Sequence, residues 1–106
     1  MRQKPEPALQ LDENGQYIIT KEWVRWSVTS QGGYSIPENN NQVIIQFKGF
    51  GEITGLEEYT ELTTLWLEGN GITQISGISH MTKLVMLYLQ SNGIQTITGL
   101  DTFSQL

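Results

Sequence analysis

Hydrophobic positions recur every 22 residues along the second half of the chain. Aligning the sequence with itself at that offset gives three rows, which we call row one (40–61), row two (62–83) and row three (84–105), and Leu106 stands where a fourth row would begin. Each row opens on a short apolar–polar alternation, which is typical of a strand with one buried face. The inward columns hold Val43, Leu65, Leu87 and Ile45, Leu67, Leu89. We therefore expect successive rows to stack as a parallel sheet on the concave side of a solenoid, with strands ~4.8 Å apart.

Polar and glycine positions repeat with the same period. Asn70 and Asn92 follow the predicted strands, with Lys48 at that position in row one. A buried amide at such a turn can both donate to and accept from backbone groups that the turn leaves unpaired, so both asparagines are predicted to be structural. Each is followed by glycine, where we expect an unusual φ or a close backbone approach. A second glycine column precedes a short convex return, predicted as a 3₁₀ or short helical turn.

The strand positions between the buried columns are predicted to face outward on the concave side. The central column holds Ile44, Trp66 and Tyr88, and two flanking columns lie beside it. Aromatic and methionine side chains on such a face are typical of a partner-binding surface, although lateral stacking between strands is an alternative role. The predicted binding residues are Ile44, Thr64, Trp66, Glu68, Met86, Tyr88 and Gln90.

The residues before the rows differ in composition. Residues 1–19 are predicted to be a mobile tail containing a hairpin signal, the Asn-Gly pair inside "LQLDENGQYIIT". Residues 20–39 are predicted to be an N-terminal cap, made of a helix over 20–29 and a loop. Thr20 is the expected N-cap, and the two tryptophans of the helix would cover the edge of row one.

Composition and charge exclude several classes of function. The net charge of −5 argues against binding a phosphate backbone, and the absence of cysteine excludes a disulfide framework, a zinc finger and a thiol nucleophile. The longest apolar run, Leu84–Leu89, is far shorter than a membrane span, and the N-terminus lacks the apolar stretch of a signal peptide. His80, the single histidine, has no neighbouring set of metal ligands in the sequence. We therefore expect no enzyme activity, no cofactor, no metal and no contact with nucleic acid or membrane.

Two acidic segments are candidates for ion or partner binding. "DENG" at 12–15 resembles part of a calcium loop, but the twelfth position would be Lys21, so a turn is the preferred interpretation. Glu57, Glu58 and Glu61 would lie on the convex side of row one. We interpret them as a solvated face, with a docking patch for a basic partner as the alternative.

The pattern L-x-x-L-x-L-x-x-N-x-I is that of the leucine-rich repeat, and the 22-residue period resembles the SDS22-like class. The predicted fold is therefore an α/β leucine-rich-repeat solenoid over 40–106, with short parallel concave strands and a helical N-terminal cap. The match to one family is closer. "YSIPENNNQVIIQFKGFGEITGLEEYTELTTLWLEGNGI" resembles the junction of cap and first repeat in the dynein axonemal assembly factor 1 family, and "LYLQSNGI" continues the likeness.

This resemblance implies a protein-binding scaffold rather than an enzyme. It would be a cytoplasmic factor for the pre-assembly of axonemal dynein arms in motile cilia or flagella, and its partners would be dynein-arm subunits or co-assembly factors. The alternative is a generic SDS22-like adaptor, phosphatase-regulatory or cytoskeletal, that binds a protein through its concave face. The apolar edge of row three also leads us to expect that the native chain continues beyond Leu106.

Overall fold

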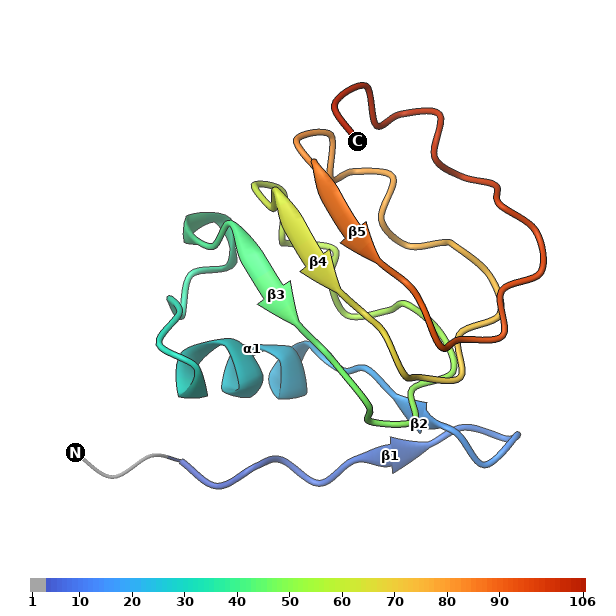
Figure 1. Ribbon diagram of the computed structural model, residues 1–106. Helices are drawn as coiled ribbons and strands as arrows, with labels where there is room; N and C mark the ends of the chain where they lie inside the picture. Colours follow the sequence, from blue (N-terminus) through green and yellow to red (C-terminus); the bar gives the residue numbers. More distant parts are fainter. Residues whose placement is uncertain (1–3) are drawn as a thin grey trace.

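The computed structural model describes residues 4–106. Its main sheet has three parallel strands in the order β3 (Gln42–Ile44), β4 (Thr64–Trp66) and β5 (Met86–Tyr88). The strands lie side by side, and the chain returns behind each of them in a long loop (Figure 1). This arrangement is a solenoid with the strands on one side, and it confirms the fold predicted from the repeat.

The strand register reproduces the sequence period. Gln42 pairs with Thr64 and Thr64 with Met86, so equivalent residues of the three rows stand beside one another at each step. Alternation then sends one set of side chains into the core, where Val43, Ile45, Leu65 and Leu67 are almost fully buried. Burying such a side chain contributes about 1.5–3 kcal/mol, which makes this column a main source of stability.

The convex returns are tight turns rather than regular helices. In each row one backbone N–H donates to the carbonyl three residues before it: Tyr59 to Leu56, Met81 to Ile78, and Phe103 to Leu100. All six residues are apolar or aromatic, and their side chains close the core from the convex side. The spacing within each pair is that of a single 3₁₀ turn, which fits the few residues available for the return.

The cap helix α1 (Lys21–Ser30) packs beside β3 at the front of the solenoid (Figure 1). Its N-cap is Thr20, whose hydroxyl oxygen accepts from the Trp23 N–H at 3.1 Å. Trp23 is 1% exposed and meets the ring of Phe50 edge-on, with ring centroids 5.0 Å apart. The helix therefore supplies the apolar surface that the first row cannot obtain from a preceding row.

A two-stranded antiparallel hairpin precedes the helix, formed by β1 (Gln10–Leu11) and β2 (Tyr17–Ile18). The turn between them is organised by Asp12, whose carboxylate accepts from the backbone N–H groups of Asn14 and Gln16. The "DENG" segment is thus a turn, and the Asp12 carboxylate accepts hydrogen bonds from its backbone. The hairpin also reaches row one, since Tyr17 forms an isolated parallel bridge with Phe50.

The described part of the segment expected to be a mobile tail lies against α1. The indole N–H of Trp23 donates to the Glu6 carboxylate at 2.9 Å, and that of Trp26 donates to the Lys4 carbonyl at 2.8 Å. These bonds give both indoles an acceptor, which a tryptophan needs when it is largely withdrawn from water. Residues 1–3 of the predicted tail lie outside the described residues. A 3₁₀ turn, η1 (Pro37–Asn39), completes the cap loop before β3.

Candidate protein-binding face

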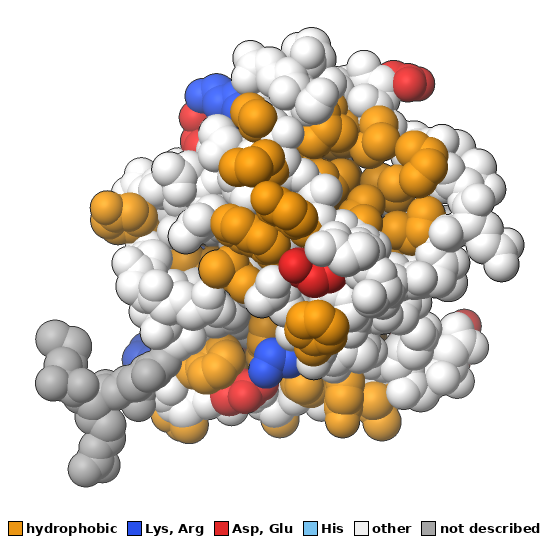
Figure 2. All heavy atoms as spheres, viewed as in Figure 1, with side chains coloured by type: hydrophobic (Ala, Val, Ile, Leu, Met, Phe, Trp, Pro, Cys, Tyr) orange, Lys and Arg blue, Asp and Glu red, His pale blue; other side chains and the backbone are white. Residues whose placement is uncertain are grey.

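The central outward column of the sheet carries two stacked aromatic rings. Trp66 and Tyr88 are paired residues of β4 and β5, and their ring centroids lie 5.4 Å apart with planes 1° from parallel. Ile44 stands beside Trp66 on β3. Figure 2 shows a band of hydrophobic side chains running across the strands on the side turned to the viewer. All three side chains are half-buried, so they combine an ordered position with surface that a partner can reach.

The residues of the two flanking outward columns differ in how exposed their side chains are. Met86 is 46% exposed and Gln90 is exposed, as expected for side chains that face outward. The structure differs from expectation at Thr64 and Glu68, which are only 6% and 9% exposed. Both belong to row two, which has a neighbouring row on each side, so adjacent side chains cover positions that alternation alone predicts to be open.

An asparagine ladder holds the turns that follow the strands. The Asn70 amide oxygen accepts from the N–H groups of Lys48 and Phe50, and its nitrogen donates to the carbonyls of Ile45 and Leu67. Asn92 repeats this pattern one row later, toward Asn70, Ile72, Leu67 and Leu89. Each amide therefore joins its own row to the row before it. This fixes the strand ends and, with them, the outward column.

A positive φ occurs in every row at the residue before Asn70, Asn92 or Lys48, the equivalent of these asparagines in row one. Phe47, Gly69 and Ser91 occupy equivalent positions and have φ values of 54°, 74° and 62°. Of the first glycine column, only Gly49 has a positive φ, at 81°. Gly71 meets the other expectation, a close approach, because a Cβ added there would collide with the Gln16 side-chain amide, and Gly93 meets neither. Asn70 and Asn92 can bond both rows because the left-handed residue before each turns the chain inward.

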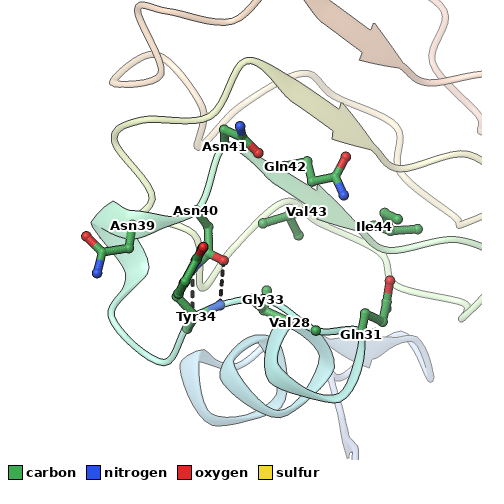
Figure 3. Close-up of a pocket in the computed structure, with 11 residues that line it drawn as sticks. Val28, Gln31, Gly33, Tyr34, Asn39, Asn40, Asn41, Gln42, Val43 and Ile44 are labelled. Atoms are coloured by element: carbon green, nitrogen blue, oxygen red, sulfur yellow. Dashed lines mark hydrogen bonds between the residues drawn. The ribbon is translucent and has the colours of Figure 1, made fainter.

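A polar cavity of about 320 Å³ lies between the end of the cap helix and the outer edge of β3 (Figure 3). Asn40 holds its wall: the amide oxygen accepts from the Tyr34 N–H, and the amide nitrogen donates to the Tyr34 carbonyl, both at 2.9 Å. The lining comes from α1, the cap loop and β3, and it contains no Asp, Glu, His, Lys or Arg side chain. The polar side chains shown as sticks, amides and the Tyr34 phenol, offer hydrogen bonding to a group in the cavity.

The candidate chemical groups elsewhere serve structural contacts. The His80 Nε2 lies 2.9 Å from the Leu56 carbonyl of the preceding row, which links rows one and two on the convex side. In the acidic cluster, Glu58 pairs with Lys21 at 3.9 Å and Glu61 pairs with Lys83. The hydrogen bond from Lys83 lowers the pKa of Glu61. Among residues 4–106, no three His, Asp or Glu side chains come together as a set that could hold a metal ion.

Several contacts of the cap were not anticipated. The Gln16 side chain donates to the Gly71 carbonyl at 3.2 Å, and the Thr54 hydroxyl donates to the Ile19 carbonyl at 2.8 Å. They tie the hairpin and the start of α1 to rows one and two. Gln16 and Ile19 both lie outside the repeating rows, so the period carries no signal for these two contacts. No helix in the described part of the chain is long and apolar enough to cross a membrane.

Comparison with known proteins agrees with this geometry. Residues 60–102 match the family model described as leucine-rich repeats, in two copies. A 39-residue stretch, 37% of this chain, is 46% identical to the dynein axonemal assembly factor 1 homolog of Drosophila pseudoobscura pseudoobscura. A stretch of the same length is 49% identical to the homolog of Drosophila melanogaster. These stretches span 2% and 3% of the length of the two relatives.

Solved structures of two Listeria monocytogenes str. 4b F2365 proteins share the fold. An internalin (inlF) aligns with a TM-score of 0.62 and 34% identity over 66% of this chain and 21% of that chain. An internalin C2 (inlC2) aligns with a TM-score of 0.66 over 78% of this chain and 41% of that chain, and at 18% identity this likeness shows the fold alone. With its 22-residue register, its asparagine ladder and these matches, the chain is a leucine-rich-repeat solenoid with a helical N-terminal cap.

Proposed function

We propose that this chain is a non-catalytic scaffold that binds a protein partner on the concave face of its sheet. The observation that carries the proposal is the ordered, half-exposed column of Ile44, Trp66 and Tyr88, with Met86 beside it. Aromatic and methionine side chains that are already held in place lose little entropy on binding and are enriched at the centre of protein interfaces. The face is also built on strands, which keeps its geometry fixed.

The biological setting that we propose is the cytoplasmic pre-assembly of axonemal dynein arms for motile cilia or flagella. It rests on the two Drosophila relatives, which are named as dynein axonemal assembly factor 1 homologs and share 46–49% identity with this chain over 39 residues. Identity at that level over a segment is higher than the 34% shared with the internalin inlF over 66% of the chain. Dynein-arm subunits or co-assembly factors are the partners that this setting implies.

The alternative is a generic SDS22-like adaptor in a phosphatase-regulatory or cytoskeletal complex. The observation in its favour is that the similarity to the internalin inlF extends over 66% of the chain, whereas the dynein-factor similarity extends over 37%. The two functions would use the same concave face. They differ in which complex is lost when the protein is absent.

Depletion in a flagellated or ciliated cell that expresses this protein tests the dynein assignment. We expect electron micrographs of axoneme cross-sections to lack dynein arms, and motility to fall. Re-expression of the unmodified protein should restore both. The variant Met86→Glu, which places a charge at a 46% exposed position of the concave face, should fail to restore them. The matched control Gln95→Glu adds the same charge at an exposed position of row three outside the strand, and it should restore them.

Normal arms and normal motility after complete depletion would overturn the assembly role and leave the adaptor alternative. Full rescue by Met86→Glu would instead count against the concave face as the binding surface. Circular dichroism and a thermal melt of the purified variants separate a loss of binding from a loss of fold.

A further inference from the structure

One carboxylate oxygen on the concave face is buried without a hydrogen-bond partner. Glu68 follows β4 and is 9% exposed, and its Oε1 is withdrawn from solvent with no hydrogen-bond donor. The Glu68 carbonyl, in contrast, has a partner, since it accepts from the Phe47 N–H at 3.0 Å. Removing an ionised carboxylate from water without a compensating donor is strongly unfavourable. The feature is therefore either a cost to the fold or half of an interaction.

Nothing in the outward columns neutralises this carboxylate. Gln46 and Gln90 occupy the equivalent positions of rows one and three, and both are uncharged. Glu68 is the one charged residue in the outward columns, which hold Gln42, Ile44, Gln46, Thr64, Trp66, Glu68, Met86, Tyr88 and Gln90. The ion pairs of the described residues, Lys21 with Glu58 and Lys83 with Glu61, involve other carboxylates. Since neither ion pair involves Glu68, a binding partner is a source of positive charge for this carboxylate.

The surroundings suit a cation on a long side chain. Trp66 lies two residues before Glu68, so alternation places both side chains on the same face of the sheet. Trp66 and the parallel ring of Tyr88 form an apolar surface next to the carboxylate, and the Tyr88 hydroxyl is turned toward the Met86 sulfur at 3.5 Å. An ion pair formed against such a surface is shielded from water and is stronger than one in bulk solvent.

We propose that the protein partner of this face presents an arginine, whose guanidinium pairs with Glu68 while its aliphatic stem lies along Trp66 and Tyr88. This proposal rests on the binding role of the concave face, and it does not depend on dynein-arm assembly. Arginine fits better than lysine because its planar fork can bond both carboxylate oxygens and because it is more weakly hydrated. The last torsion of a glutamate side chain is soft, so the carboxylate can turn to meet the incoming group.

Titration of the whole chain with short peptides tests this pairing without knowledge of the natural partner. The probe is acetyl-Gly-Arg-Gly-amide, followed through the Trp66 indole N–H signal in two-dimensional NMR. The neutral analogue carries citrulline in place of arginine, and a third peptide carries lysine. We expect saturable shifts with arginine in the millimolar range and binding weaker by about tenfold or more with citrulline. The lysine peptide should bind with an intermediate constant.

Two variants locate the effect. Glu68→Gln should weaken the arginine peptide by about tenfold or more, and Glu57→Gln, which removes an exposed charge on the convex side, should leave its binding unchanged. Glu68→Gln should also melt at or above the temperature of the unmodified protein, because it removes an unpaired buried charge. These readouts are independent of the depletion experiment, so either proposal can fail without the other.

Four outcomes would overturn the proposal. They are the absence of a saturable shift of the Trp66 signal, equal binding of arginine and citrulline peptides, equal or tighter binding of lysine, and unaltered arginine binding by Glu68→Gln. A melting temperature lowered by about 4 °C or more in Glu68→Gln would likewise contradict it. That result would mean that the carboxylate already has a stabilising contact inside the protein.

Discussion

Rows one and three carry the same chemical pattern but bury it to very different extents. Ile53, Ile75 and Ile97 are equivalent residues of the three rows, and they are 2%, 6% and 71% exposed. The inward strand residues behave alike, since Leu65 and Leu67 are fully buried whereas Leu87 and Leu89 are half-buried. Figure 2 shows hydrophobic side chains gathered at the surface beyond β5 as well as over the strands. The repeat therefore determines which residues are apolar, while the neighbouring rows determine how deeply each one is buried and how much it contributes to stability.

The front end of the solenoid has a dedicated cover that the other end does not show within residues 4–106. Trp23 and Val24 of α1 are 1% and 0% exposed, and they lie against a row that has no preceding repeat. Solenoids require such ends because each repeat contacts only its neighbours. The contrast between the two ends can be tested with matched substitutions of equivalent residues.

The largest expected effect comes from truncating one isoleucine of the shared column. Ile53→Ala should lower the free energy of unfolding by about 2–5 kcal/mol, because it leaves a cavity in a filled core. Ile97→Ala should change it by no more than about 0.5 kcal/mol, since that side chain is 71% exposed. Urea unfolding followed by circular dichroism measures both values. Equal losses for the two variants would contradict the idea that neighbouring rows determine the contribution of a repeat.

The asparagine ladder should give the next largest effect. Asn70→Ala removes the acceptor of the Lys48 and Phe50 N–H groups and the donor to two carbonyls, so we expect a loss of about 2–3 kcal/mol. Asn39→Ala, at an exposed position of the cap loop, is the matched control and should be nearly neutral. Thermal melts compare the two. If Asn70→Ala melts like the control, the ladder is not what holds the turns.

Two glycines from the repeating columns provide a smaller and sharper contrast. Gly77 has a φ of 72°, and a Cβ added there would lie 2.3 Å from the Ile53 carbonyl oxygen. Gly93 has no positive φ, and its nearest neighbour to an added Cβ is the Thr73 methyl group at 3.5 Å. Gly77→Ala should therefore cost about 1–3 kcal/mol, and Gly93→Ala should be close to neutral. Urea unfolding midpoints, compared at equal dependence on denaturant, measure both effects. A larger loss of stability for Gly93→Ala than for Gly77→Ala would contradict the prediction.

The smallest effect concerns the pH dependence of row one. Burial raises the pKa of Tyr59 above its ordinary value of 10.0. The unfolded chain then loses the tyrosine proton first, so stability should decline as the pH rises past 10 toward the folded pKa. Tyr59→Phe, which copies Phe103 of row three, should flatten that decline. The difference between the denaturant midpoints at pH 8 and pH 11 is the measurement, and identical pH profiles would refute the assignment.

The sequence predicted those features of the fold that depend on the period. The strands, their parallel register and the inward leucines follow from alternation repeated at a fixed spacing. The helix was expected over 20–29 and is observed at Lys21–Ser30, with Thr20 as its N-cap. These features rest on local patterns, which a single sequence displays directly.

Features that depend on contacts between rows were not predicted. The burial of Glu68 arises because row two is covered on both sides, and nothing in its local sequence differs from an exposed outward position. The left-handed conformation of Phe47 was also missed, because a bulky residue is rare in that region. In the stacked rows this residue is equivalent to Gly69, which shows the conformation that the position requires. The contacts of Lys4, Glu6 and Gln16 are long-range and do not recur from row to row, so no sequence pattern predicts them.

The asparagine ladder has a direction, and that direction bears on synthesis. Each amide completes the turn of the row before it, so the turn of row one stays unsatisfied until Asn70 has been made, 22 residues after Lys48. At about 5–20 residues per second, a ribosome takes roughly 1–4 s to add that length. Each new row then supplies the asparagine that completes the turn of the row before it. A nascent solenoid of this kind therefore matures one row behind its growing end.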